Sequence, residues 1–373
     1  MENSRILIIT HNKGGGSTYY LKNMINILSD GYQFIILKKL ETDLVELTIN
    51  DNEESWTETY HLIHRYNQLL YRLLSLKLSG IHINHLIDYP LTYIAQLIFD
   101  LRLPYVVSIH DWYYISGHPH LITPLKNLQD QDQDIPYKEN IGQKSVSFIN
   151  NIRAIFEKAQ VVIVPTYCVK EEYQERFPTT NFKVIYHENI KYQFMPKVIK
   201  GLTKEEKRLK IGLIGDFHEY KGYNIVRDCV EEVEIRKLPI DFYHWGISCP
   251  HDKIIYMGAY QGRNELMEKI KMIDIDLFWI PSQVYEIYCY VLTEMQMIGL
   301  PILSANIPTF LERCKEYSGH KSYSLTLSFI DIVNIFDHLL KNDIESNHKA
   351  IVHNSHNNGY ITLYNTIFKN LNN

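Results

Sequence analysis

Residues 5–28 read RILIITHNKGGGSTYYLKNMINIL and contain a strand pattern, a glycine-rich turn and a helix pattern in that order. The apolar run at residues 5–10 is typical of a buried strand, and residues 18–28 have the spacing of an amphipathic helix. Gly14, Gly15 and Gly16, followed by Ser17, let the backbone approach a ligand between the two. This order predicts a parallel sheet with crossover helices.

Short β-branched runs alternate with helical patterns along the rest of the chain, and 373 residues exceed the length at which one core usually stops growing. We therefore predict an α/β protein with two Rossmann-like domains, residues 1–195 and 205–350, joined by a polar linker within residues 195–210. The irregular region at residues 117–140 is expected to be a loop over a site. Strands are predicted at residues 5–10, 33–37, 81–84, 105–109, 161–164, 183–186, 209–214, 241–244, 253–256, 276–280 and 301–304. Helices are predicted at residues 18–28, 91–101, 223–234, 264–272 and 290–298.

Composition narrows the class of protein. A hydrophobic content of 45% with 22% charged residues is that of a globular chain, and a net charge of -5 gives no electrostatic reason to expect a nucleic-acid partner. Five widely spaced cysteines without a CxxC pair indicate reduced thiols in a cytoplasmic protein. No stretch approaches 18 uncharged apolar residues, so no membrane span is expected. The leucine-rich residues 69–78 are interpreted as a helix packed on a sheet, with peripheral contact to a bilayer surface as the alternative.

The glycine turn alone does not identify a ligand. It lacks the GxGxxG spacing of dinucleotide-binding proteins. The second predicted strand ends at Lys38 and Lys39 and not at an acidic residue. Both observations disfavour a dinucleotide-dependent oxidoreductase. A second turn lies within residues 211–222 (IGLIGDFHEYKG). A predicted strand ends there at Gly215, and Lys221 comes just before a predicted helix. A lysine at this edge of the sheet can neutralise a leaving diphosphate; a solvated surface lysine is the alternative.

The most informative stretch is residues 281–301, PSQVYEIYCYVLTEMQMIGLP. Seven residues separate Glu286 from Glu294, and a predicted helix starts between them. A helix start offers unpaired amides to an anion, so phosphates are expected near Tyr290 and Val291, a sugar near Glu286 and ribose near Glu294.

This pattern resembles the Glu-x7-Glu motif of glycosyltransferase family 4, and most closely its bacterial polysaccharide and O-antigen branch. Residues 286–294 (EIYCYVLTE) are similar to that branch's motif, residues 221–223 (KGY) to its Lys-Gly-Tyr segment, and residues 110–114 (HDWYY) to its His-Asp-Tyr loop. The resemblance extends from the glycine turn to about Cys314. It implies the GT-B architecture, with two domains facing across a cleft and a last helix, within residues 351–373, that often crosses back to the first domain.

The resemblance also implies the activity. A nucleotide-diphosphate sugar would be the donor, and a glycan or lipid-linked molecule in surface polysaccharide synthesis would be the acceptor. The transfer would retain the configuration of the sugar, and it would need no metal or other cofactor. Asp130 and Asp132 lie in a polar low-complexity stretch, so no Asp-x-Asp metal motif is expected at a strand end. The implied catalytic residues are His110, Lys221 and Glu286, and the implied donor-binding residues are Gly15, Gly16, Gly215, Tyr288, Cys289, Tyr290, Val291 and Glu294.

Three departures from the family pattern leave alternatives open. Asp216 follows Gly215 where much of the family has arginine, Cys289 stands where it often has glycine, and residues 117–120 (GHPH) replace the branch's Cys-Pro-Arg. A non-catalytic nucleotide-sugar-binding homologue with a scaffolding role, and a hydrolase or epimerase of free nucleotide sugars, are the alternative functions. His110 could instead be a structural histidine at a strand end, or bind a metal together with Asp111, His118 and His120.

Overall fold

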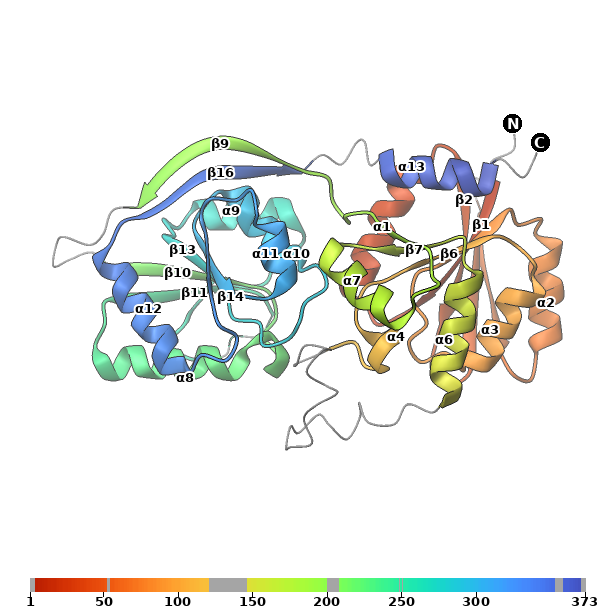
Figure 1. The fold of residues 1–373 in the computed structure, drawn as a ribbon, viewed down its shortest axis with the longest axis horizontal. Helices are drawn as coiled ribbons and strands as arrows, with labels where there is room; N and C mark the ends of the chain where they lie inside the picture. Colours follow the sequence, from red (N-terminus) through yellow and green to blue (C-terminus); the bar gives the residue numbers. More distant parts are fainter. Residues whose placement is uncertain are drawn as a thin grey trace. The chain divides into compact units, whose positions relative to one another are not determined.

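The computed structural model describes residues 4–51, 54–120, 146–199, 208–247, 249, 251–352 and 358–369. These residues form two compact units (Figure 1). The described residues of the first unit are those within 4–119, 146–189 and 358–369, and the described residues of the second unit are residue 120 and those within 190–352.

An eight-stranded sheet forms the centre of the first unit, in the order β4-β3-β2-β1-β5-β6-β7-β8. All neighbours from β2 to β8 are parallel, whereas β3 and β4 form an antiparallel extension at one edge that the sequence patterns had not predicted. The central strand is fully buried at residues 6–9, which explains its uninterrupted apolar run. The strands are β1 (Ser4–His11), β2 (Tyr32–Lys39), β3 (Leu44–Asp51), β4 (Glu54–His61), β5 (Gly80–Ile83), β6 (Tyr105–Ser108), β7 (Val161–Val164) and β8 (Phe182–Val184).

The helices of this unit are α1 (Gly16–Leu28), α2 (Tyr66–Ser75), α3 (Leu91–Asp100), α4 (Tyr113–Ser116), α6 (Val146–Lys158), α7 (Tyr167–Arg176), α13 (Asn358–Tyr364) and the π-helical η3 (Asn365–Lys369). α13 packs against α1 although more than 300 residues separate them (Figure 1). The Tyr364 hydroxyl bonds the buried His82 ring, and a Cβ at Gly80 would overlap the Phe368 ring. Residues 358–369 therefore complete the core of the first unit.

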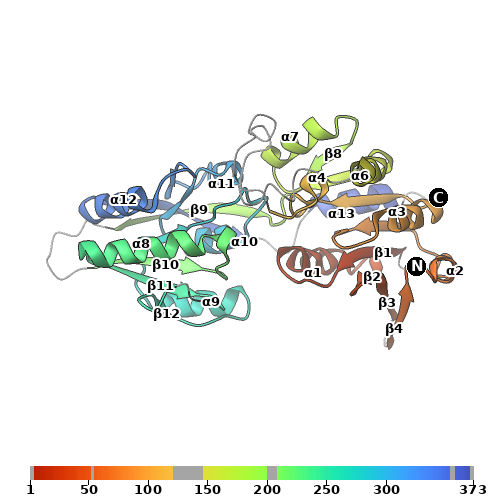
Figure 2. The ribbon, with the colours of Figure 1, turned by 90° about the horizontal axis from the view of Figure 1, so that it is seen from below.

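A six-stranded, fully parallel sheet forms the second unit, in the order β12-β11-β10-β13-β14-β15. Its strands are β10 (Leu209–Ile214), β11 (Ile240–Trp245), β12 (Ile255–Tyr256), β13 (Leu277–Ile280), β14 (Ile302–Ala305) and β15 (His320–Tyr323). The helices are η2 (Glu219–Lys221), α8 (Tyr223–Arg236), α9 (Arg263–Lys271), α10 (Tyr290–Ile298), α11 (Pro308–Arg313) and α12 (Phe329–Lys341). α8 and α12 pack against each other on one side of this sheet (Figures 1 and 2). The core includes Trp245, Trp279, Phe310 and Phe336.

A two-stranded antiparallel ribbon joins β9 (Ile190–Ile199) to β16 (Ile344–Val352), and β16 contacts α10. The prediction that residues 195–199 belong to a linker is therefore wrong. Proline cannot donate to a ladder, but the register of the ribbon shifts between Ser346 and His348, beside Pro196, and this irregularity accommodates it. Residues 200–207 of the predicted linker lie outside the described residues, as do residues 121–140 of the predicted loop, and residues 209–210 belong to β10.

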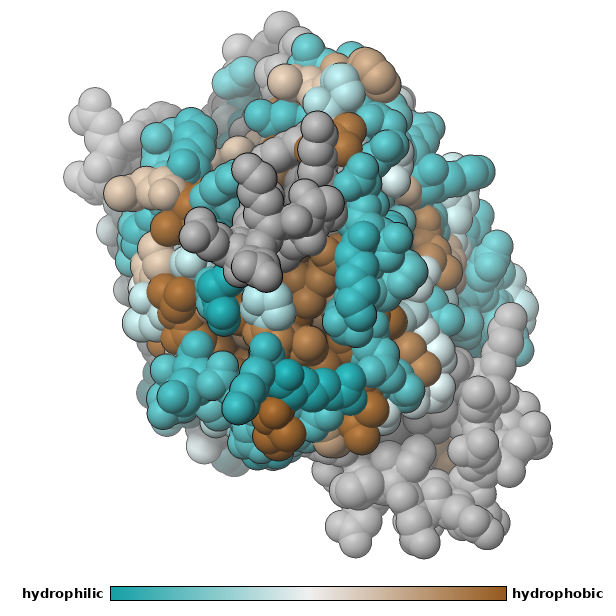
Figure 3. Space-filling model, turned by 90° about the vertical axis from the view of Figure 1, so that its left-hand side faces the viewer, coloured by the Kyte–Doolittle hydropathy of each residue, from teal (hydrophilic) through white to brown (hydrophobic). Residues whose placement is uncertain are grey.

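The surface of the second unit mixes apolar and polar residues when it is seen from the left-hand side of Figure 1 (Figure 3). Exposed apolar side chains in this unit include Val198, Ile235 and Met272. Scattered exposure of this kind is ordinary for a globular surface. In the first unit, Leu69, Leu73 and Leu76 of the leucine-rich stretch are buried, as expected for a helix packed on a sheet. No helix among the described residues is long and apolar enough to cross a membrane.

Candidate active site

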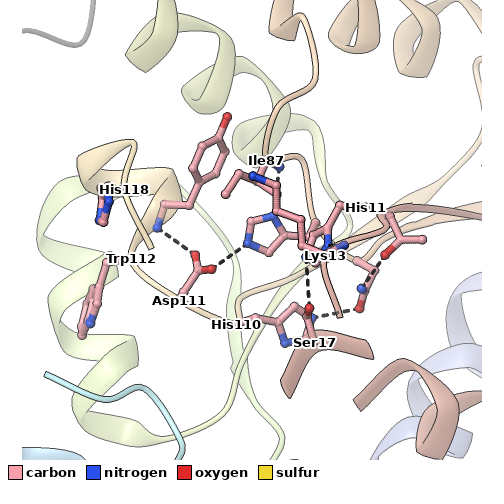
Figure 4. A network of polar contacts seen from close by, with 12 residues as sticks. His11, Lys13, Ser17, Ile87, His110, Asp111, Trp112 and His118 are labelled. Carbon is pink, nitrogen blue, oxygen red and sulfur yellow. Dashed lines mark hydrogen bonds and ion pairs between the residues drawn. The ribbon is translucent and has the colours of Figure 1, made fainter. Parts of the chain in front are cut away.

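His110 lies just beyond the carboxyl end of β6, in a polar network with residues that follow β1 and β5 (Figure 4). Its Nε2 is 2.9 Å from Asn84 Oδ1, and Asn84 Nδ2 donates to Thr10 Oγ1 at 2.9 Å. Because the Asn84 oxygen can only accept, the His110 proton is on Nε2. Nδ1 is then an acceptor, and it is buried without a hydrogen-bond partner. His110 therefore has one buried acceptor atom that no described group uses.

Burial keeps His110 neutral, and the histidines around it act in the same direction. The His187 and His85 rings have their centroids 5.4 Å and 6.3 Å from that of His110. Burial lowers the pKa of His110 well below its usual value, and the neighbouring His187 and His85 lower it further. Burial likewise lowers the pKa of His11 to about 4 and that of His82 to about 3. A neutral imidazole can accept a hydrogen bond but carries no charge to offer a phosphate.

Asp111 orients its own loop. One carboxylate oxygen lies 2.9 Å from His85 Nε2, and the other accepts from the backbone amide of Tyr113 at 2.9 Å, at the start of α4. In Figure 4, His118 lies away from His110, with Asp111 between them. Within the described part of the chain, no group of three or more His, Cys, Asp or Glu side chains is placed to hold a metal ion. The metal-site alternative for His110, Asp111, His118 and His120 therefore gains no support.

The glycine turn precedes α1. Gly14 and Gly15 have φ angles of 75° and 77°, with open space where a side chain would lie, and Gly16 is the first residue of α1. The Ser17 hydroxyl is 3.1 Å from His11 Nε2. The predicted residues Gly15 and Gly16 thus lie in an exposed turn at a helix N-terminus, where amides can meet an anion.

In the second unit, Lys221 and Glu286 form an ion pair. A Cβ at Gly222 would overlap the backbone of Pro281, so the residue after Lys221 must be glycine for the two loops to approach. The Ser282 hydroxyl donates to Glu286 Oε1 at 3.1 Å. Burial lowers the pKa of Lys221, but the charge and hydrogen bond of Glu286 outweigh it and the net pKa is raised. The Lys221 side chain remains 37% exposed, so this fixed positive charge can reach a ligand.

α10 starts directly after this ion pair. Its N-cap residue is Cys289, with φ 65° and ψ 90°, a region that favours glycine and explains why glycine often stands here in the family the sequence resembles. Burial, followed by the Glu286 charge, raises the pKa of the Cys289 thiol to about 11. A Cβ at Gly215, at the end of β10, would lie 3.5 Å from Val291 Cγ2. The loop after β10 and the first turn of α10 are therefore neighbours.

Glu294 lies one turn further along α10, where its Oε2 accepts from the Tyr260 hydroxyl at 3.4 Å. Burial raises the pKa of Tyr260, and the Glu294 charge raises it further. The structure thus gives the two motif glutamates different surroundings. Glu286 is paired with a cation, whereas Glu294 contacts a neutral phenol.

Two findings modify the residue predictions. The Tyr288 ring is buried and stacks on the Arg313 guanidinium, 3.8 Å from the ring centroid, so only the backbone of Tyr288 remains to meet a ligand. Asp216 is exposed and accepts from the Ile247 amide at 2.6 Å, linking the loops after β10 and β11. The sequence patterns did not predict that Arg313, Ser282 and Tyr260 contact the motif residues. A Ser four residues before Glu286 was visible, but no spacing signal linked the other two to the motif.

The comparisons with protein-family models and with curated proteins find no match. Solved structures do match. HepE of Anabaena, in complex with UDP and glucose, superposes with a TM-score of 0.58 at 12% identity, over 98% of this chain and 96% of that one. Sucrose-phosphate synthase of Thermosynechococcus elongatus gives 0.58 at 14% identity, over 91% and 90% of the two chains. WaaG, a glycosyltransferase involved in lipopolysaccharide biosynthesis, gives 0.54 at 11% identity, over 90% of each chain.

These neighbours are glycosyltransferases of the GT-B architecture. The likeness extends over both sheets of this chain, and the alternation of parallel strands and helices agrees with it. The predicted fold class is confirmed: the chain has the GT-B fold, built from two Rossmann-like domains.

Proposed function

We propose that this chain is a retaining glycosyltransferase that moves a sugar from a nucleotide-diphosphate sugar to a glycan or lipid-linked acceptor in surface polysaccharide synthesis. One observation carries the proposal. The Lys221–Glu286 pair lies directly before the N-terminus of α10, with Glu294 one turn along that helix, in a chain with the GT-B fold. The solved structures of HepE with UDP and with UDP-glucose support a nucleotide-sugar donor.

The proposed chemistry needs positioning and charge. In front-face transfer the acceptor hydroxyl attacks from the side on which the nucleoside diphosphate leaves, and a donor phosphate oxygen takes its proton, so no protein base is required. The charge that develops on the leaving group is met by Lys221 and by the amides that open α10. Glu286 holds Lys221 in place and lies where the transferred sugar would bind. A single exposed cation and a helix start can supply this stabilisation without a metal.

The remaining residues fit the donor. We assign Glu294 to the ribose hydroxyls, because a carboxylate oxygen accepts hydrogen bonds from hydroxyl groups. The unused Nδ1 acceptor of His110 supports the role that the resemblance assigns to it, a hydrogen bond from a hydroxyl of the donor sugar.

A donor and product assay tests the proposal. Purified protein is first tested for thermal stabilisation by UDP-, GDP-, ADP- and dTDP-sugars, since a ligand of the folded state raises the melting temperature. The stabilising donor is then incubated with glycan and lipid-linked acceptors, and the anomeric configuration of the product is read by NMR. We expect the donor's configuration to be retained. An inverted product, or no stabilisation and no nucleotide release with any donor, contradicts the proposal.

A second candidate is a homologue that binds nucleotide sugars without turnover. Asp216 favours it, because an exposed carboxylate stands beside the helix start where the family has arginine and would repel a diphosphate. Slow nucleotide release from the stabilising donor separates the two candidates. Binding without any release supports the scaffold, whereas fast release that needs no acceptor and forms no glycoside indicates a hydrolase or epimerase.

A further inference from the structure

Arg313, the last residue of α11, is buried beneath the N-terminus of α10. Its Nη1 donates to the carbonyl oxygen of Tyr288 and, at 2.7 Å, to that of Cys289. Its Nη2 donates to the hydroxyl of Thr293 at 2.5 Å, and its plane stacks on the Tyr288 ring. One side chain thus holds both ends of the turn that leads into α10.

These contacts set the direction of two amides. In a trans peptide the C=O and N–H bonds point in opposite directions, and the described residues contain no cis peptide bond. With the carbonyls of Tyr288 and Cys289 turned toward Arg313, the amides of Cys289 and Tyr290 point away from it. That is the side on which a helix N-terminus receives an anion.

The same contacts hold an unfavourable backbone. Cys289 has a positive φ, which residues other than glycine rarely adopt. The two carbonyls that Arg313 binds belong to the peptide groups on either side of this residue, so the guanidinium restrains the conformation from both sides.

Arg313 also changes the local charge. The Lys221 ammonium is paired with the Glu286 carboxylate, which offsets its positive charge. Asp216 stands where the family that the sequence resembles has arginine, so a second cation is absent at that position. A buried guanidinium behind two aligned peptide groups polarises them, and its field is screened less than that of a surface cation. The positive charge reaches the helix start through backbone dipoles instead of through direct contact.

We propose that Arg313 is a positioning residue that preorganises the start of α10 for a diphosphate. The identity of that diphosphate as the donor's rests on the proposed function, but the anion-binding geometry does not. Inorganic pyrophosphate is therefore the probe, because it tests the phosphate site without a nucleobase or sugar.

Pyrophosphate binding is measured by titration calorimetry for the wild type, Arg313→Lys and Arg313→Met. Removing a charge-assisted network predicts a loss of affinity of roughly ten- to a hundredfold for Arg313→Met. Arg313→Lys keeps the charge but loses the planar fork, and we expect a loss of about tenfold with little change in melting temperature. Arg236→Met is the control: Arg236 ends α8, bonds Glu232 and Asn334, and its loss should leave pyrophosphate affinity unchanged.

Unchanged affinity in Arg313→Lys and Arg313→Met, or no pyrophosphate binding by the wild type, overturns the proposal. If Arg313→Met does not fold, Arg313→Lys alone decides. Pyrophosphate binding that depends on Arg313 in a protein with no transferase activity would instead reject the proposed function and keep this inference.

A double-mutant cycle separates positioning from general stability. Glycine adopts a positive φ without strain, so the turn in Cys289→Gly depends less on the arginine. We expect Arg313→Met to cost clearly less pyrophosphate affinity in the Cys289→Gly background than in the wild type. Equal losses in the two backgrounds would refute the claim that Arg313 acts through the backbone at residue 289.

Discussion

Removing the Lys221 ammonium should separate catalysis from stability. The proposed charge stabilisation of a leaving diphosphate depends on this group, and loss of one fixed stabilising donor costs about 3–4 kcal/mol in the barrier, or roughly 10²–10³ in kcat. The folded state depends on it less. The Lys221 side chain is 37% exposed but that of Glu286 is only 12% exposed. Removing the ammonium therefore leaves a largely buried carboxylate with the Ser282 hydroxyl as a partner and costs about 1–3 kcal/mol, more than loss of a surface ion pair. Lys221→Ala should therefore still fold and turn over slowly.

The assay compares steady-state transfer and urea unfolding for the wild type, Lys221→Ala and Lys271→Ala. Lys271 is the matched control, because it is 66% exposed and pairs with Glu268 at the end of α9. We expect Lys271→Ala to keep full turnover. Near-normal turnover in Lys221→Ala, or a loss of activity that merely follows a loss of folded protein, would refute the assignment of Lys221 to the leaving group.

Three further predictions use the same preparations. Glu286→Gln should mainly lower kcat, because a contact at the reacting sugar strengthens in the transition state. Glu294→Gln should mainly raise the donor KM, because a ribose contact does not strengthen there. If kcat and the donor KM of both variants stay within about twofold of wild type, the motif assignment is contradicted. Transfer should survive EDTA, and a complete loss that manganese restores would overturn metal independence. The pKa values of His11 and His82 are lower in the folded state than in the unfolded state. The free energy of unfolding is therefore highest above about pH 6.5, where both rings are neutral in both states. It falls as the pH drops toward 4 for His11 and toward 3 for His82, by up to about 1.4 kcal/mol per pH unit for each group. Urea unfolding between pH 7 and 4 measures this slope, which His11→Asn should reduce and the exposed His338→Gln should not.

Apolar runs located the sheet strands well. Residues 161–164 and 209–214 form strands with the predicted bounds. A strand buried on both faces needs a nearly continuous apolar run, which residues 161–164 (VVIV) supply in full and residues 209–214 (LKIGLI) supply except at Lys210. β3 was missed although Val45, Leu47 and Ile49 alternate with polar residues, since an alternating, half-buried pattern is a weaker signal than a continuous apolar run. β9 was missed because its partner, β16, lies about 150 residues away, and nothing local to Pro196 indicates a strand.

The candidate site was predictable only where its residues are close in sequence. Glu286 and Glu294 lie on either side of a helix start, so their spacing carries the signal. Arg313 reaches the same helix start from α11, and Tyr260 reaches Glu294 from the loop before α9, through contacts that only the folded chain creates. The direction of a peptide group, which the Arg313 contacts set, has no signature in sequence at all.

The packing of residues 358–369 against α1 and β5 has a consequence for biosynthesis. The ribosome makes these residues only after the whole second unit, yet Tyr364 bonds His82 and the Phe368 ring occupies the space that Gly80 leaves open. Until these residues leave the ribosome, Tyr32, His82 and Met24 lack the hydrogen-bond partners that Tyr364 and Asn365 provide, so the core of the first unit stays incomplete. Residues 190–352, which carry both the six-stranded sheet and the ribbon, form one continuous stretch, so the ribosome has made all of these strands before the first unit receives its last core residues.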